Sequence, residues 1–220
     1  MQKQKSRPLK KALPTFEANM MIRYAVKSFF IVVLFLSVTG EATAQKNNFD
    51  YRILRHIESR RTKSKTAFYK FVSKWNNPVC LAAPATLLVA GLIRDDSYMK
   101  KSSLYVTESI AISSLVNVIL KKIIKRKRPF ANEITFTAEV RPKNESFPSG
   151  HTAEAFSMAT SMSLAYPKWY VIIPTYGWAS LGGYSRMYLG VHYPTDVIAG
   201  ATISSALSWL TYRANTSLRK

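Results

Sequence analysis

The hexapeptide FPSGHT, residues 147–152, is a short polar turn that opens directly onto an apolar run beginning at Ala153. Pro148 ends the preceding segment, Ser149 is a favourable N-cap, and Gly150 lets backbone amides approach a ligand. The first N–H groups of a helix lack intrahelical partners, and the helix dipole favours negative charge there. The stretch therefore predicts an anion site, most naturally for phosphate, although four such residues alone are more typical of an ordinary capped turn.

A basic block lies upstream of this turn. Its sequence is KKIIKRKRP, residues 121–129. Lys121 and Arg128 are seven positions apart, so a helix through both would place the two cations on one face.

A third block, SRMYLGVHYPTD, occupies residues 185–196. Pro194 stands where a new helix can begin, which places Asp196 in the first turn of that helix. From there the carboxylate can reach back to His192, fix its tautomer and stabilise it when it is charged.

Together, the three blocks resemble the signature of the type 2 phosphatidic acid phosphatase family, which shares its fold with vanadium haloperoxidases and bacterial class A acid phosphatases. The family pattern is Lys, six residues, Arg-Pro; then Pro-Ser-Gly-His; then Ser-Arg, five residues, His, three residues, Asp. All of it is present here in order, across residues 121–196, and apolar segments extend the resemblance over most of the chain after about residue 77. The resemblance implies an all-α helical bundle embedded in a membrane, with five helices after signal cleavage and six if the leader is retained.

The resemblance also implies a role for each signature residue. His192 would attack phosphorus to form a phosphohistidine, Asp196 would hold its ring, and His151 would protonate the leaving group. The phosphoryl oxygens would be held by Lys121, Arg128, Ser149, the Gly150 amide and Arg186.

Elementary chemistry agrees with these roles. Phosphoryl transfer needs positioning and positive charge on the equatorial oxygens, which three fixed cations can supply without a metal. The sequence has three histidines, one cysteine and no Asp-rich motif, so we expect no metal site and no cofactor.

Charge suggests an anionic partner. The chain of 220 residues has 32 basic and 12 acidic residues and a formal charge of +20. Such a balance suits nucleic acid or anionic lipid. There is no recognisable nucleic-acid module, and the basic residues cluster in the leader, at 46–74 and at 121–128, so we expect a membrane and no nucleic acid.

The N-terminal leader is typical of a secretory signal peptide. It has a basic start, a short apolar run at residues 28–38 and an Ala-x-Ala site ending at Ala44, so residues 1–44 would be removed. The polar stretch before the apolar run is long for a signal, and we expect the true start at Met20 or Met21. An uncleaved first membrane helix is the alternative.

Three regions follow the leader. Residues 45–76 form a basic amphipathic region that either lies on the membrane surface or packs on the domain. Residues 77–214 form the phosphatase-like helical domain, residues 215–220 form a basic tail, and the polar loop 131–147 is placed where substrate-selecting contacts are expected. The apolar segments of the domain are residues 77–93, 103–120, 149–166, 169–184 and 194–213.

Alternating these segments across a bilayer places all three blocks on the outer face. The inner loops then carry Arg94, Lys100, Lys101 and Lys168, as the positive-inside rule asks. We therefore predict a metal-independent phosphatase at the bacterial inner membrane, with its active site facing the periplasm and a lipid phosphomonoester or diphosphate as substrate. Undecaprenyl diphosphate, phosphatidylglycerol phosphate, phosphatidate and lipid A phosphate all fit. The alternatives are a secreted soluble acid phosphatase, a vanadate-dependent haloperoxidase and a non-catalytic lipid-phosphate binder.

Other residues suggest structural roles. The single cysteine, Cys80, lies in an apolar setting typical of a buried thiol, and His56 is expected at the surface. The remaining cations of the first block are expected to form an exposed basic collar beside the membrane: Lys122, Lys125, Arg126 and Lys127.

Overall fold

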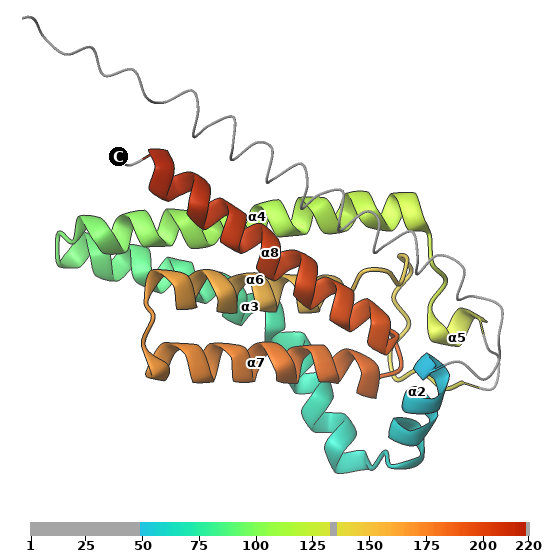
Figure 1. Cartoon of the computed structure of the whole chain (residues 1–220). Coiled ribbons are helices and arrows are strands. Elements are labelled where there is room, and N and C mark those ends of the chain that lie inside the picture. The colour runs from blue at the N-terminus through green and yellow to red at the C-terminus, as the bar shows by residue number, and fades with distance from the viewer. Residues whose placement is uncertain (1–48, 133–135, 219–220) are drawn as a thin grey trace, which may run out of the picture. The chain divides into compact units, whose positions relative to one another are not determined.

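The computed structural model describes residues 49–132 and 136–218. The expected leader 1–44, with its start at Met20 or Met21, lies outside the described residues. The described chain is helical (Figure 1), with these elements: α2 Phe49–Ser59, α3 Lys63–Ile93, α4 Ser97–Ile124, α5 Pro129–Asn132, α6 Gly150–Ala165, α7 Trp169–Tyr188 and α8 Pro194–Leu218. The five long helices, α3, α4, α6, α7 and α8, correspond to the five apolar segments, and the all-α fold is confirmed.

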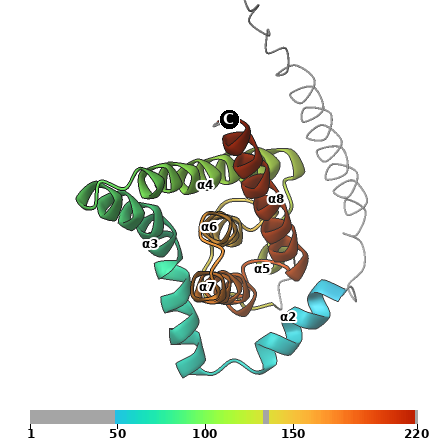
Figure 2. The same cartoon turned by 60° about the vertical axis from the view of Figure 1, so that its left-hand side comes forward.

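Helix α6 lies at the centre of the bundle. It contacts α3, α4, α7 and α8, and Figure 2 shows it nearly end-on with the other long helices around it. Its small residues, among them the fully buried Ala155 and Ala159, allow close helix packing. The Ser113 hydroxyl donates to that of Ser157 at 3.1 Å, and the Ser157 and Ser208 hydroxyls lie 2.9 Å apart. The polar side chains of Ser103, Ser113 and Asn117 on α4 are thus buried against protein.

Large apolar side chains point away from this core. Exposed examples are Leu81, Leu88, Leu92, Leu104, Leu115, Ile173 and Ile198. Such apolar surface on the outside of a protein marks an interaction with another apolar phase. Among the described residues, the stretches Lys63–Ile93 and Ser97–Asn132 are each long and apolar enough to cross a membrane.

Helix α3 begins earlier than the apolar run suggested. It starts at Lys63, where the Thr62 side chain accepts a hydrogen bond from the Lys65 N–H at 3.3 Å, and it continues without a break through residue 77. Pro78 and Pro84 lie inside it, and Figure 2 shows the helix changing direction part-way along. Since a proline removes a helix hydrogen bond and clashes with the preceding turn, these residues account for the bend.

Helix α2 packs against the helical domain. Its contacts are with α7 and α8. Tyr51, Leu54 and Ile57 recur every three residues along it and are buried, while His56 is exposed, as expected. The sequence left open whether this basic region lies on the membrane surface or packs on the domain. Its helix α2 packs on the domain.

Candidate active site

The three sequence blocks meet at one end of the bundle. Long helices that follow one another in the chain run in opposite directions, so α4 and α7 end where α6 and α8 begin. Lys121 lies in the last turn of α4 and Arg186 in the last turn of α7, while Asp196 lies in the first turn of α8. The signature residues, far apart in sequence, are therefore brought together.

The expectation that Lys121 and Arg128 share a helix face is wrong. Helix α4 ends at Ile124, and Lys125 adopts a left-handed conformation with a φ of 51° that stops the helix. Arg128 lies beyond this turn, and the two cations meet in another way. The Lys121 Nζ donates to the Glu145 carbonyl at 2.5 Å, and the Arg128 Nη2 donates to the same oxygen at 3.3 Å.

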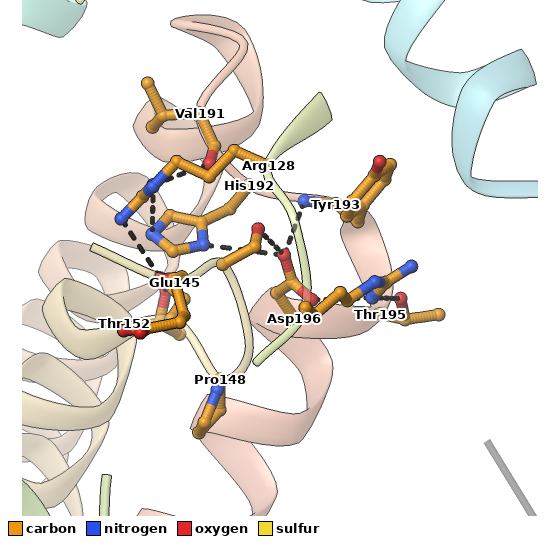
Figure 3. Close-up of polar contacts among 12 residues, drawn as sticks. Arg128, Glu145, Pro148, Thr152, Val191, His192, Tyr193, Thr195 and Asp196 are labelled. Atoms are coloured by element: carbon orange, nitrogen blue, oxygen red, sulfur yellow. Dashed lines mark hydrogen bonds and ion pairs between the residues drawn. The ribbon is translucent and has the colours of Figure 1, made fainter. Parts of the chain in front are cut away.

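Arg128 fixes the tautomer of His192 (Figure 3). Its Nε donates to the Asn144 carbonyl at 2.7 Å and its Nη1 to the Val191 carbonyl at 2.7 Å, and the same Nη1 lies 3.2 Å from His192 Nε2. Because a guanidinium can only donate, Nε2 must accept and carry the ring's lone pair. The ring proton of the neutral imidazole is then on Nδ1, which faces Asp196.

Asp196 is fully buried and held on several sides. Its Oδ2 accepts from the Ser146 hydroxyl at 2.5 Å and from the Tyr193 N–H at 2.9 Å. The same oxygen lies 3.5 Å from His192 Nδ1, which has no hydrogen-bond partner among the described residues. The expected reach-back is present at ion-pair distance, and catalytic hydrogen bonds are often this long until a substrate binds.

Burial sets the protonation state of His192. Removal of the ring from water lowers its pKa to about 3, although the Asp196 carboxylate opposes that shift. The imidazole is therefore neutral at ordinary pH, and its Nε2 lone pair faces Arg128.

Arg126 joins two buried carboxylates and is not part of an exposed collar. Its Nη1 donates to Asp196 Oδ1 at 2.6 Å and to the Thr195 hydroxyl at 2.8 Å, its Nη2 donates to Asp50 Oδ2 at 2.8 Å, and its guanidinium stacks 3.9 Å from the Tyr193 ring centroid. Asp50 also accepts from the Thr195 N–H at 3.1 Å and hydroxyl at 2.6 Å, so it caps the start of α8. Lys122, Lys125 and Lys127 are exposed, as the collar prediction requires.

The FPSGHT turn begins α6, but not with the expected cap. Ser149 occupies the N-cap position, yet its side chain caps no backbone amide, and its Oγ instead accepts from the Thr152 hydroxyl at 2.8 Å. The first-turn amides of α6, that of Gly150 included, are thus not capped by this serine. The Ser149 N–H donates to the Asp196 carbonyl at 3.1 Å, which ties the turn to α8.

Arg186 and His151 face a pocket of about 520 Å³. Arg186 is 5% exposed, its Nη1 donates to the Ser73 hydroxyl, and its Nε has no hydrogen-bond partner among the described residues. His192 is 2% exposed and does not line this pocket. The pocket is therefore lined by His151 and Arg186, and His192 lies deeper in the protein.

Three buried cations have no anionic hydrogen-bond partner among the residues that the structure describes. Lys121, Arg128 and Arg186 donate to carbonyl, amide, hydroxyl and imidazole acceptors, while the Asp196 carboxylate is already paired with Arg126. Buried charges are costly unless they are paired. The arrangement is thus complementary to a bound anion. Within residues 49–132 and 136–218, no group of three or more metal-ligating side chains is placed to hold a metal ion.

The PAP2 superfamily model matches residues 102–220. The chain belongs to the PAP2 superfamily. This match confirms the family predicted from the three blocks, and together with the phosphatases among the relatives it confirms the predicted enzyme class.

Two curated proteins and one solved structure illustrate the PAP2 relationship. The chain is 29% identical over 185 residues to an undecaprenyl-diphosphatase of Sulfolobus acidocaldarius, covering 83% of this chain and 85% of that protein. It is 33% identical over 104 residues to a lipid A 4'-phosphatase of Bacteroides thetaiotaomicron, covering 44% of this chain and 46% of that protein. The fold matches the transmembrane PAP2 type phosphatidylglycerolphosphate phosphatase of Bacillus subtilis with a TM-score of 0.67 and 24% identity, over 85% of this chain and 95% of that one.

Several residues of the PAP2 site carried no recognisable signal in the sequence. Asp50 and Ser73 precede the matched region, and both reach the site only because α2 and α3 pack against the other helices. Asn144 and Ser146 lie just before the FPSGHT turn, and they contact Arg128 and Asp196, respectively. Their position in the loop 131–147, where substrate-selecting contacts were expected, was the one sequence signal that pointed to a functional role for them.

Proposed function

We propose that this chain hydrolyses a lipid phosphomonoester or diphosphate through a phosphohistidine formed on His192. The observation that carries the proposal is the set of three buried cations, bonded to neutral acceptors, beside a neutral histidine whose Nδ1 faces a fixed carboxylate. The names of the relatives support a lipid substrate, since they act on undecaprenyl diphosphate and lipid A.

The proposed reaction uses the site as follows. A phosphoryl group displaces the Arg128 contact from His192 Nε2 and takes hydrogen bonds from Lys121, Arg128 and Arg186. Nε2 then attacks phosphorus, the bond to the leaving oxygen breaks, and His151 gives that oxygen a proton. Asp196 stabilises the charged ring. Water then hydrolyses the phosphohistidine and releases inorganic phosphate.

The Ser149 hydroxyl and the first-turn amides at Gly150 complete the proposed phosphate cradle. Both lie at the N-terminus of a helix of 16 residues, where N–H groups and the helix dipole favour an anion. Positive charge and oriented amides together offset the charge that builds on the phosphoryl oxygens.

Phosphate release tests this proposal. The detergent-purified full chain is incubated with undecaprenyl diphosphate, phosphatidate and lipid A in the presence of a chelator, beside a His192→Ala variant. We expect release by the wild type, none by the variant, and acid-labile phosphate on the wild-type protein alone. Release that persists in the His192→Ala variant would contradict the covalent mechanism, and a wild type that releases nothing would contradict the phosphatase proposal.

We further propose that the site faces the periplasm from the bacterial inner membrane. Alternation of the five long helices supports this orientation, because it leaves the basic Arg94, Lys100 and Lys168 at the opposite end. Cysteine labelling in spheroplasts tests it, since the native Cys80 is buried and 1% exposed. A membrane-impermeant maleimide should label a Lys143→Cys variant, whose cysteine lies at the same end of the bundle as the site. It should not label a Lys168→Cys variant, whose cysteine lies at the opposite end. The reverse pattern would place the site in the cytoplasm.

A further inference from the structure

One face of α3 forms a wall of the active-site pocket. Lys70, Ser73, Lys74 and Asn77 follow the spacing i, i+3, i+4 and i+7, which is a single helical stripe, and all four line the pocket with His151 and Arg186. Ser73 is in direct contact with Arg186. This stripe lies before residue 102, where the family match begins, so the signature blocks assign it no role.

The two lysines on this stripe have side chains that are available to a ligand. Lys70 pairs with Glu139 at 2.9 Å, but the two side chains are 46% and 33% exposed, and an exposed pair of this kind is weak. Lys74 is exposed and has no ion pair among the described residues. Their charge adds to that of Arg186 on the same pocket.

The depth of His192 fixes which part of the substrate meets these lysines. The pocket reaches His151 and Arg186 but not His192, so the phosphoryl group must enter from the pocket and pass Arg186 to be attacked. In-line displacement places the leaving group opposite the nucleophile. The leaving group therefore remains in the pocket, beside His151 and against the α3 stripe.

A neutral leaving group would gain nothing from two cations in this wall. A leaving group that is itself a phosphate would gain charge-assisted hydrogen bonds, because the second phosphorus of a diphosphate is bonded to the very oxygen that breaks away. We propose that Lys70 and Lys74 form a subsite for this second phosphate, and that the substrate class is a lipid diphosphate.

The reaction balances without a further reactant. The bond from His192 Nε2 to the terminal phosphorus forms as the bond from that phosphorus to the bridging oxygen breaks. The bridging oxygen leaves on the lipid monophosphate and takes the proton of His151. Water then cleaves the phosphohistidine, and the products are one lipid monophosphate and one inorganic phosphate.

This inference rests on the proposed function, and one experiment separates the two. Phosphate release by the detergent-purified full chain is measured with farnesyl diphosphate and with farnesyl monophosphate, which share a tail and differ by one phosphate. The variants are Lys74→Gln, Lys74→Arg and Lys70→Gln. The control is Lys65→Gln, an exposed lysine of the same helix that lines a different pocket with His56 and Tyr184.

We expect the wild type to prefer the diphosphate. Lys74→Gln should lower kcat/KM for farnesyl diphosphate about tenfold, or about 1.4 kcal/mol, and change it less than about twofold for the monophosphate. Lys70→Gln should also lower kcat/KM for the diphosphate. Lys74→Arg should keep the preference for the diphosphate, and Lys65→Gln should match the wild type on both substrates.

Two results would overturn the subsite. One is equal use of the two substrates by the wild type, and the other is an equal loss on both substrates in Lys74→Gln, which would mean general attraction of anionic lipids. A folded wild type that releases phosphate from neither substrate would overturn the proposed function, and this inference with it.

Discussion

Replacing Arg126 by Gln removes the cation that, among the described residues, contacts both Asp50 and Asp196 beside the site. Arg126 donates to Asp196 Oδ1 at 2.6 Å and to Asp50 Oδ2 at 2.8 Å. Glutamine is too short to reach both and carries no charge. The variant therefore keeps Asp50 and Asp196 in place without the charge that offsets their burial, at 5% and 0% exposure.

These contacts set the loss of stability and of rate expected for Arg126→Gln. Removing one partner of a buried ion pair costs about 3–5 kcal/mol, a large part of a stability of about 5–15 kcal/mol. For catalysis, one hydrogen bond to a charged group is worth about 1.5–3 kcal/mol, or about 10- to 150-fold in rate. We expect a loss of this size in kcat with little change in KM, because Ser146 and the Tyr193 N–H still hold the other oxygen of Asp196.

The assay pairs thermal unfolding in detergent with phosphate release, and the matched control is Lys127→Gln, an exposed cation next to Arg126 in sequence. A double variant, Asp50→Asn with Arg126→Gln, should recover part of the lost stability because one unpaired charge is gone. If Arg126→Gln equals the Lys127→Gln control in both unfolding midpoint and kcat, Arg126 does not position Asp196 and the reasoning is refuted.

Three further outcomes are expected. Ser146→Ala removes a 2.5 Å hydrogen bond to the buried carboxylate, so kcat should fall about tenfold, and an unchanged kcat would deny the contact a role. A Cβ at Gly200 would lie 2.8 Å from the Ser149 carbonyl, whereas one at Gly177 would meet nothing within 4 Å. Gly200→Ala should therefore cost about 1–3 kcal/mol with a loss of activity. Gly177→Ala should leave activity unchanged and raise stability by up to about 1 kcal/mol, because alanine is the better helix former. Because burial lowers the pKa of His192 to about 3, the unfolded state binds the extra proton below about pH 6.5, so lowering the pH to 5 should cost about 2 kcal/mol. This loss should be absent in His192→Gln, and an equal pH dependence in both proteins would show that His192 is not its source.

The sequence predicted those parts of the site that depend on local sequence position. Pro194 and Asp196 begin α8 as expected because a proline at the first helical position and an acid in the first turn act locally. The central helices followed from their apolar runs, which depend on composition alone.

Residues that meet through tertiary packing were not predictable in this way. Arg126 looks like its neighbours Lys125 and Lys127 in the sequence, and only the left-handed turn at Lys125 points it inward. The same turn ended α4 before Arg128, which a simple helical count had placed on the face of Lys121. Asp50 offered no motif at all, since its role depends on how α2 docks against the start of α8.

Helix α6 touches every other long helix, and the side chains that Arg126 joins at the candidate site come from positions as far apart as 50 and 196. The order of synthesis therefore matters. A nascent chain that has inserted α3, α4, α6 and α7 already contains Lys121, Arg128 and His151, but not yet His192 or Asp196. Of the carboxylates that pair with Arg126 in the described part of the chain, such a nascent chain contains Asp50 and lacks Asp196. Under the proposed mechanism, hydrolytic capacity appears only when the last helix has entered the membrane, so a stalled or truncated chain is expected to be inert towards the lipids around it.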